Sequence, residues 1–208
     1  MSISSTELRG LLARTLAVLP AHAEELRELD AALGDGDLGI TVQAGSAAVV
    51  KALAALPEGA SVAEVLLAAG KAFSTANPST FAALIGGGLL AASKTMAGKD
   101  AVGKEEALAI GRAVAGRIIE RGKSQVGDKT VLDALVPSLD MLENTDGDTD
   151  ALLAAMIATS QERVKATAGL QSQKGRAAWV QERSIGHADP GATAYSRFLE
   201  ALREGMKG

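Results

Sequence analysis

Residues 29–39 read LDAALGDGDLG, and this stretch is the most informative part of the chain. An apolar helical segment carries Asp30, and the glycines that flank Asp35 predict a turn that folds Asp35 and Asp37 back toward Asp30. Three carboxylates held so close together repel one another unless a cation lies among them. Oxygen ligands without His or Cys suit Mg²⁺, which binds a few carboxylates and completes its shell with water and phosphate oxygens. The stretch therefore predicts a magnesium–nucleotide site.

The same stretch is also typical of a plain surface turn, because Asp and Gly both tolerate turn geometry. Spacing alone leaves these two interpretations open. A calcium loop of the EF-hand type is a poorer match, since Gly39 takes the third ligand position and residues 44–46 offer no closing Glu.

The composition predicts one all-α domain spanning residues 1–208. The chain has 208 residues and is 47% hydrophobic, which is enough for one core, but only 2% aromatic. The core must then be built from Ala, Leu, Val and Ile, and Ala is the best helix former. There are no cysteines, which excludes disulfides, thiolate metal sites and a cysteine nucleophile, and fits the cytoplasm.

Charge and hydropathy exclude two classes of partner. The net charge is −4 and no basic run is present, so we expect no nucleic acid. Glu7, Arg9 and Arg14 interrupt the apolar stretch in residues 1–20, which indicates an amphipathic helix and not a signal peptide. Because no segment reaches about 18 uninterrupted apolar residues, we expect no membrane span.

Apolar periodicity, caps and Pro or Gly stop signals predict helices at about 5–19, 23–33, 40–56, 61–73, 81–96, 104–121, 130–142, 150–170 and 190–206. Polar, glycine-rich loops occupy alternate junctions, at 34–39, 74–80, 122–130 and 171–191. In an up-and-down arrangement alternate junctions share one end of the bundle, so these loops are expected to line a single site. The junctions at Pro20, 57–59 and 144–149 are expected to be ordinary turns at the opposite end.

Two loops carry further candidates. The run Gly127-Asp128-Lys129-Thr130 precedes a helix, where free backbone N–H groups bind phosphate, but Asp128 or Thr130 could equally be an N-cap. The nearby Gly122-Lys123-Ser124 is not a Walker A loop, since the preceding glycine pattern and a strand are missing. Near the C-terminus, His187 and Asp189 suggest an acid–base pair, although Asp189 also suits the N-cap of a helix that Pro190 opens.

Three segments together resemble the nucleotide-binding L subunit of dihydroxyacetone kinases and the matching C-terminal domain of single-chain versions. They are residues 29–39, residues 121–130 (RGKSQVGDKT) and residues 174–193 (KGRAAWVQERSIGHADPGAT). The resemblance covers nearly the whole chain in order and length. It implies a closed barrel of about eight antiparallel amphipathic helices, with ADP or ATP bound at one end through two Mg²⁺ ions.

The resemblance also implies roles for individual residues. Asp30, Asp35 and Asp37 would hold the metals, and Arg176 would reach a phosphate and act in catalysis. The 74–80 loop would cover the phosphates, and residues 189–191 would line the adenine side. The full set of implied nucleotide contacts is Leu38, Thr41, Ser79, Thr80, Gly122, Thr130, Val131, Arg176, Asp189, Pro190 and Gly191.

The chain departs from the family pattern in three places. Members commonly have His where Leu38 stands and often Asn where Thr41 stands, and their phosphate loop often reads GGASG where residues 76–80 read ANPST. The metal ligands are intact. The differences bear on the phosphate contacts, and they suggest another short keto sugar, such as a tetrulose, as substrate.

By resemblance, the chain is the phosphoryl-donating subunit of a glycerone-type kinase of glycerol metabolism, and a separate K subunit holds the ketose through a histidine. The donor is either freely exchanging ATP, or bound ADP that a phosphotransferase M subunit rephosphorylates from phosphoenolpyruvate. A homodimer is also compatible with the resemblance. One alternative is a nucleotide-loaded module that regulates a transcription factor. Another is the nucleotide domain of a fatty-acid kinase, against which the short length and the C-terminal motif argue.

Overall fold

A computed structural model describes residues 2–207 of the chain, and the described part is almost entirely helical. The all-α prediction is therefore confirmed. Two-residue strands β1 (Ile3–Ser4) and β2 (Ala101–Val102) form a small antiparallel pair that the sequence did not predict. The helices are α1 (Ser5–Val18), η1 (Leu19–His22), α2 (Ala23–Leu33), α3 (Leu38–Ala54), α4 (Val62–Ala76), α5 (Thr80–Thr95), α6 (Lys104–Gly122), α7 (Leu132–Asn144), α8 (Thr149–Thr167), η2 (Arg176–Ser184) and α9 (Pro190–Gly205), where η marks 3₁₀ geometry.

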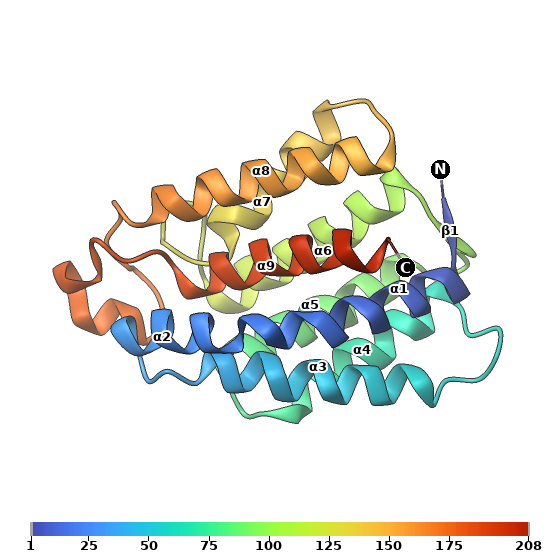
Figure 1. Ribbon diagram of the computed structural model, residues 1–208, viewed down its shortest axis with the longest axis horizontal. Coiled ribbons are helices and arrows are strands. Elements are labelled where there is room, and N and C mark those ends of the chain that lie inside the picture. The colour runs from blue at the N-terminus through green and yellow to red at the C-terminus, as the bar shows by residue number, and fades with distance from the viewer. Residues whose placement is uncertain (1, 208) are drawn as a thin grey trace.

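The segments α1, η1 and α2 follow one another along a single line (Figure 1). Pro20 lies in the first turn of η1, where its missing N–H costs little, and the backbone at Leu19 and Ala23 stays in the right-handed helical region. The expectation that Pro20 marks a turn at the end of the bundle is therefore wrong. If α1, η1 and α2 are counted as one continuous helical element, residues 2–207 contain eight long helical elements.

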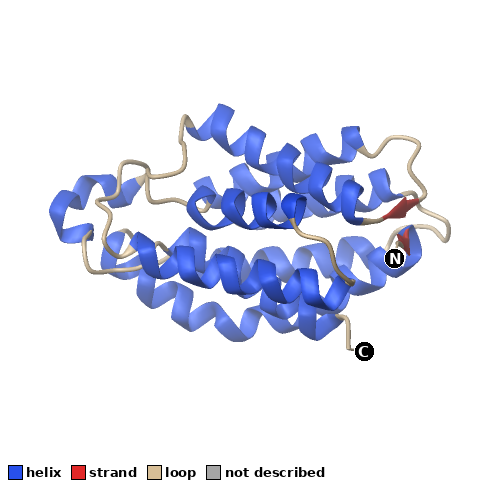
Figure 2. Ribbon diagram, turned by 90° about the horizontal axis from the view of Figure 1, so that it is seen from above, coloured by secondary structure: helices blue, strands red, loops and turns tan. Residues whose placement is uncertain are grey.

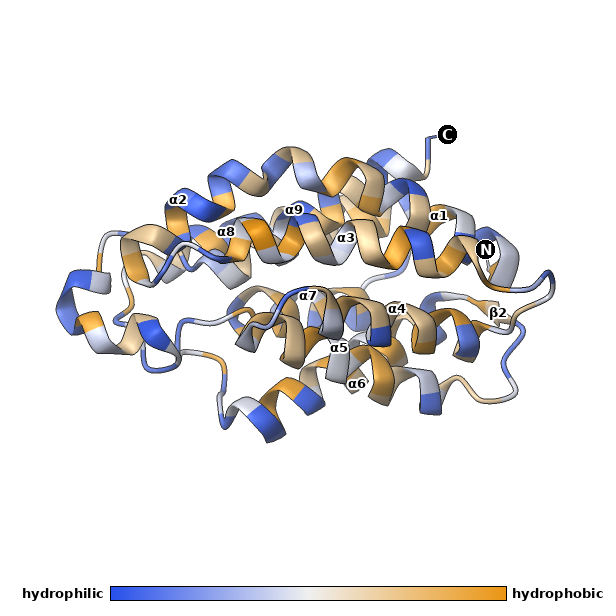
Figure 3. Cartoon of the chain, turned by 90° about the horizontal axis from the view of Figure 1, so that it is seen from below, coloured by the Kyte–Doolittle hydropathy of each residue, from blue (hydrophilic) through white to orange (hydrophobic). Residues whose placement is uncertain are grey.

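The helices close into a ring. Each contacts the next in chain order from α3 to α9, and α9 returns to pack against α1, while α3 packs against both α1 and α2. Figure 2 shows the helices running in nearly parallel or antiparallel directions along the long axis. Apolar and polar residues alternate along the helices in Figure 3, as expected of amphipathic helices with one face in the core.

The core consists mainly of Leu, Val and Ala, as the composition predicted. Its largest cluster joins α1, α2, α3, α4, α5 and α9, and includes the fully buried Leu26, Val62 and Val65. The run of glycines at 86–88 does not interrupt α5. Gly86 lies so close to α4 that an added Cβ would stand 2.5 Å from the Cβ of Ser74, so small residues here permit close helix packing.

The chain reversals fall at two ends of the ring. One end, called the site end below, holds the connections 34–37, 77–79, 123–131 and 168–189; the other, the opposite end, holds 55–61, 96–103 and 145–148 (Figure 1). The loop between α4 and α5 is shorter than the expected 74–80, because α4 runs on to Ala76. Ser74 and Thr75 donate their hydroxyls to the carbonyl of Lys71, and so belong to the last helical turn. Within residues 2–207, no helix combines the length and hydropathy that crossing a bilayer requires.

Candidate functional site

The three aspartates of the 29–39 stretch meet at the site end. Asp30 lies in the last turn of α2, Asp35 in the following loop, and Asp37 immediately before α3. One carboxylate oxygen from each lies within 4.8 Å of one from each of the others. The sequence expectation that the turn folds Asp35 and Asp37 toward Asp30 thus agrees with the geometry.

The turn is built from backbone hydrogen bonds and two special glycines. The N–H of Gly34 donates to the Asp30 carbonyl at 2.5 Å, and the N–H of Leu38 donates to the Asp30 carboxylate at 3.1 Å. Gly36 has φ +73°, a conformation that side chains with a Cβ rarely adopt. Gly39 brings α3 against α2, since a Cβ there would stand 2.1 Å from the carbonyl oxygen of Ala23. Asp37 is therefore held close to Asp30 by tight packing.

Arg176 supplies the positive charge nearest to the cluster. Its guanidinium forms an ion pair with Asp35 and lies 3.7 Å from the carboxylate of Asp37. The side chains of Arg176, Asp35 and Asp37 are 54%, 45% and 35% exposed, so water screens these pairs. Burial, and then the negative charge of Asp30, raise the pKa of Asp37 above its ordinary value. The like charges are thus only partly compensated by Arg176.

A small polar network joins the first turn of α3 to the 77–79 loop. The hydroxyl of Thr41 is bonded to the Ser79 hydroxyl at 3.2 Å, and the side-chain amide of Asn77 donates to Thr41 at 2.8 Å. Ser79 also caps α5 by accepting from the N–H of Ala82 at 3.1 Å. Since Thr41 lies one helical turn beyond Asp37, this network places the loop beside the carboxylates. Thr80, the first residue of α5, is exposed.

The start of α7 is tied down by Asp133, a buried residue that the sequence analysis did not select. Its two carboxylate oxygens accept from the N–H groups of Gly127 and Thr130, each at 2.7 Å. The hydroxyl of Thr130 accepts from Leu132 at 3.2 Å. Neither Asp128 nor Thr130 is the N-cap residue, because α7 begins later, after Val131. Two of the amides expected to face a phosphate are thus already bonded within the chain.

Asp189 is buried and caps α9, with the N–H of Ala192 donating to its carboxylate at 2.6 Å. The alternative in which Asp189 is an N-cap with Pro190 in the first turn is confirmed. Burial raises the pKa of Asp189 to about 7, against the lowering effect of its backbone hydrogen bonds. His187, its expected acid–base partner, is exposed.

The remaining nucleotide-contact candidates fall into two places. Gly191 lies against α7, since a Cβ there would stand 3.4 Å from the nitrogen of Val131, so the starts of α7 and α9 adjoin. Gly122 closes α6 and lies next to Ser124 and Leu84. The structure thus brings together one group around Asp35, Arg176 and Thr41 and a second group around Val131 and Gly191.

Sequence reasoning missed Asn77, Lys129 and Asp133 as individual site residues. Asn77 was considered only as a departure from the family loop. Asp133 could have been selected from the sequence, because an acidic residue in the first turn of a helix often interacts with free backbone N–H groups. Lys129 is the largest fully buried side chain in the described part of the protein, at 2% exposure. A lysine surrounded by turn residues gives no sequence signal of burial.

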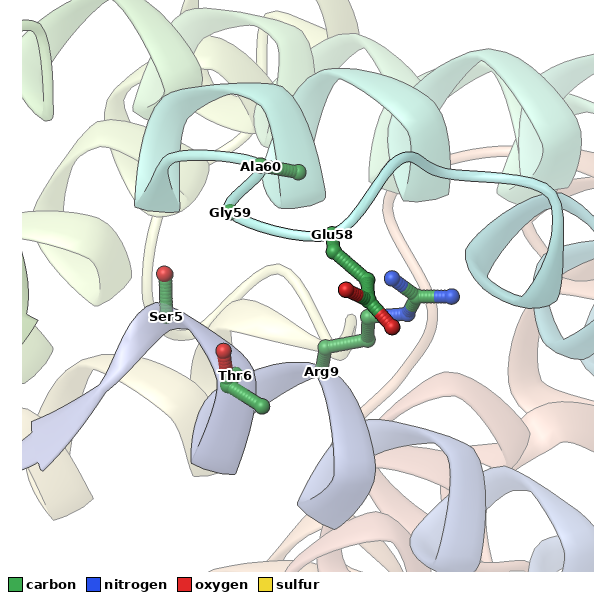
Figure 4. A pocket seen from close by; sticks show the side chains of 6 residues that line it. All are labelled: Ser5, Thr6, Arg9, Glu58, Gly59 and Ala60. Atoms are coloured by element: carbon green, nitrogen blue, oxygen red, sulfur yellow. The ribbon is translucent and has the colours of Figure 1, made fainter.

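The donor set fits magnesium. The clustered side chains are carboxylates, and neither His nor Cys takes part in the group. Figure 4 shows a different pocket, lined by Ser5, Thr6, Arg9, Glu58, Gly59 and Ala60 at the opposite end. There the Arg9 guanidinium donates to the carbonyls of Ala54 and Pro57, and thus acts as a structural tie between α1 and the end of α3.

Comparison with known proteins gives consistent matches. The sequence model of the DAK2 domain matches residues 32–204. The chain is 30% identical over 205 residues to the PEP-dependent dihydroxyacetone kinase, ADP-binding subunit DhaL, of Escherichia coli, and the match covers 97% of each protein. It is 38% identical over 176 residues to the D-erythrulose kinase of Mycolicibacterium smegmatis, covering 82% of this chain and 30% of that protein.

A solved structure shares the fold. The dihydroxyacetone kinase from C. freundii, in complex with AMP-PNP and Mg²⁺, superimposes with a TM-score of 0.76 at 23% identity. The match covers 98% of this chain and 34% of the kinase, so this chain corresponds to about a third of the larger enzyme.

Proposed function

The chain belongs to the DAK2 domain family, and from that premise we propose that residues 1–208 form the nucleotide-binding, phosphoryl-donating subunit of a short-ketose kinase. The observation that carries this proposal is the group of three carboxylates within 4.8 Å of one another, with Arg176 paired to it. The E. coli relative of matching length is named as an ADP-binding subunit of a dihydroxyacetone kinase, which supports the same role here.

We propose that Asp30, Asp35 and Asp37 hold two Mg²⁺ ions, which when bound neutralise phosphate charge and orient the phosphates for in-line transfer. The carboxylates are fixed before any ligand arrives, because the turn that carries them is held by Gly36 and by the packing of Gly39. Such preorganisation lowers the cost of ordering the site on binding.

Arg176 is proposed to change partners during the cycle. In this structure it pairs with Asp35 and approaches Asp37, so it occupies the place of a cation. With Mg²⁺ held by the carboxylates, the guanidinium of Arg176 would be free to donate to two oxygens of a phosphate in the bidentate manner that Arg favours. As the charge on the transferring group shifts in the transition state, a released guanidinium stabilises it electrostatically.

The remaining contacts are proposed in two sets. Ser79, Thr80, Thr41 and Leu38 would surround the phosphates, because the 77–79 loop and the first turn of α3 are bonded to each other beside the carboxylates. The ribose and adenine would lie toward the adjoining starts of α7 and α9, with Gly122, Thr130, Val131, Asp189, Pro190 and Gly191.

The acceptor is proposed to be a small ketose held by a separate K subunit. The erythrulose kinase relative extends well beyond the matched part, so a ketose site on other residues is consistent with the comparison. The site end also presents exposed apolar side chains suited to a protein partner, namely Ile40, Val126, Trp179 and Ile185.

The test is a reconstituted transfer assay with the chain, a K subunit and either dihydroxyacetone or erythrulose. With ATP alone, repeated turnovers indicate exchanging ATP, and a single turnover indicates bound ADP that needs phosphoenolpyruvate and an M subunit. If neither donor system phosphorylates either ketose, the proposed function is wrong. A preference for erythrulose would support the tetrulose expectation.

A further inference from the structure

Lys129 is a buried cation whose role the proposed mechanism does not use. Its side chain is 2% exposed, and its backbone has φ +61°, a left-handed conformation that is unusual for a residue other than Gly, Asn or Asp. Burial lowers the pKa of its ammonium, and the carboxylate of Asp189 opposes that change. A charge placed here needs strong compensating contacts.

Those contacts are two backbone carbonyls at the ends of one loop. The ammonium donates to the carbonyl of Leu170 at 3.0 Å and to the carbonyl of Ser184 at 2.5 Å. Between these two residues lies the 171–183 loop, which includes most of η2 and carries Arg176. A single side chain thus binds both ends of the segment that delivers the guanidinium to the carboxylates.

Other hydrogen bonds also join the two ends of this loop, which are together called its neck below. The N–H of Ser172 donates to the Ser184 hydroxyl at 2.9 Å, and the N–H of Gly186 donates to the carbonyl of Ala168 at 2.7 Å. The N–H of Gln173 donates to the carbonyl of Asp128 at 3.0 Å, which joins the loop to the turn that precedes α7. Lys129 is the charged member of this set.

Lys129 can act as a fixed anchor because its own turn is rigid. The carboxylate of Asp133, on α7, accepts from the residues on both sides of the Asp128–Lys129 pair, Gly127 and Thr130. The far part of the loop is less regular, with Gln181 at φ 50° and Trp179 80% exposed. A strained backbone of this kind persists only when its surroundings hold it in place.

We propose that Lys129 is a positioning residue whose ammonium fastens the neck of the 171–183 loop and thereby keeps Arg176 beside the carboxylate cluster, within reach of a phosphate bound there. This inference rests on the proposed function for its effect on nucleotide binding, but the fastening itself is independent of it. Lys129 acts through Arg176 and does not touch the carboxylates.

The experiment uses Trp179, the chain's single tryptophan, as a reporter on the loop. We compare native protein with Lys129→Met, which keeps the length of the side chain but removes its charge and donors. Arg183→Met is the matched control, since it removes an exposed cation from the same loop next to Ser184. Fluorescence anisotropy of Trp179 and amide hydrogen exchange report the order of the loop, and calorimetry reports the affinity for Mg-ADP.

We expect Lys129→Met to lower the anisotropy, to speed exchange in the 171–183 loop while the helices stay protected, and to weaken Mg-ADP binding about tenfold or more, the scale typical of residues that orient ligands. Arg183→Met should change neither. In an Arg176→Ala background, Lys129→Met should leave the remaining affinity unchanged, because its effect passes through Arg176.

An equal loss of affinity in the Arg176→Ala background, or an unchanged anisotropy in Lys129→Met, would overturn the proposal. Should Lys129→Met not fold, Ser184→Ala takes its place, because it removes the Ser172 bond of the same neck and must loosen the loop in the same direction. If native protein binds no nucleotide, the proposed function fails, while the anisotropy comparison still decides whether Lys129 fastens the loop.

Discussion

The two ends of the ring are built differently. At the opposite end, helix starts carry local capping boxes, in which Ser4 pairs with Glu7 and Ser61 pairs with Glu64. Contacts between distant residues occur at both ends: Asn77 contacts Thr41 across 36 residues at the site end, and Arg9 contacts Pro57 across 48 residues at the opposite end. The opposite end differs in that two of its helix starts are closed by capping boxes, which need only residues of a single helix start.

Backbone conformation shows the same difference. Of the nine residues with positive φ within the described 2–207 range, only Gly59 and Gly98 lie at the opposite end. The other seven lie at the site end and are Gly36, Lys123, Gly127, Lys129, Gly175, Gln181 and Gly186. The three that are not glycine, Lys123, Lys129 and Gln181, all lie at the site end, so strained backbone in the described residues is confined to the end that carries the three aspartates and Arg176.

The largest expected effect comes from removing a carboxylate at the site end. Asp35→Ala should abolish detectable Mg-ADP binding, because a cation between two remaining carboxylates is poorly held. The free energy of unfolding without ligand should change by less than about 0.5 kcal/mol, since Asp35 is exposed and its ion pair is screened. Titration calorimetry and urea denaturation measure the two quantities.

The matched control is Asp146→Ala, which removes an exposed carboxylate at the opposite end, 3.5 Å from Lys104. It should leave nucleotide binding at the native level. Full binding by Asp35→Ala, or equal losses in both variants, would contradict the division between the two ends.

The second expected effect is on the pH dependence of stability. Because burial raises the pKa of Asp189 from 3.8 to about 7, the folded state binds more protons than the unfolded state between these values. The free energy of unfolding should therefore decrease by a few kcal/mol as the pH rises from about 4 to about 7, and this contribution should be constant above that range.

Asp189→Asn keeps the cap on α9 but cannot titrate, so its denaturation midpoint should lack this decrease when the two proteins are compared across the same pH range. Parallel pH curves for the native protein and Asp189→Asn would show that Asp189 is not the titrating group.

Gly39→Ala is expected to lower both the free energy of unfolding and the affinity for Mg-ADP, so it is a site-end change that also affects stability. The new Cβ would overlap the carbonyl of Ala23, so α2 and α3 must move apart at a cost of about 2–3 kcal/mol. This movement also displaces Asp37. Gly116→Ala is the control, since open space surrounds that position within α6 and the better helix former should raise stability by about 1 kcal/mol.

Both variants are measured by thermal denaturation and by Mg-ADP calorimetry. A Gly39→Ala protein as stable as the native chain would show that the α2–α3 contact is looser than described.

The smallest expected effect is at the opposite end. Ser61→Ala removes the capping box of α4 and should lower the free energy of unfolding by about 1 kcal/mol. Its Mg-ADP affinity should match that of the native chain. Urea denaturation measures the free energy of unfolding and calorimetry measures the Mg-ADP affinity. Weakened binding would mean that the two ends are coupled.

Much of the fold could be predicted from the sequence, because helix signals are local. The capping boxes at Ser4 and Ser61 and the position of Pro190 mark helix starts correctly. Pro20 was misleading, since a proline at the first turn of a 3₁₀ segment continues a helical line as well as it ends one. The close approach of the three aspartate carboxylates could also be predicted, from their short spacing and from Gly34 and Gly36 on either side of Asp35.

The rest of the candidate site could not be predicted, because it depends on tertiary contacts. Lys129 is buried only because the carbonyls of Leu170 and Ser184 come to it from more than 40 residues away. The ion pair between Arg176 and Asp35 likewise joins segments that only the closed ring brings together.

The most direct test of the central claim is calorimetric titration of the native chain with ADP, once with Mg²⁺ and once with a chelator. If the clustered carboxylates bind the nucleotide through divalent ions, saturable heat appears with Mg²⁺ and is absent with the chelator. The absence of heat in both titrations, or equal binding in both, would contradict the account.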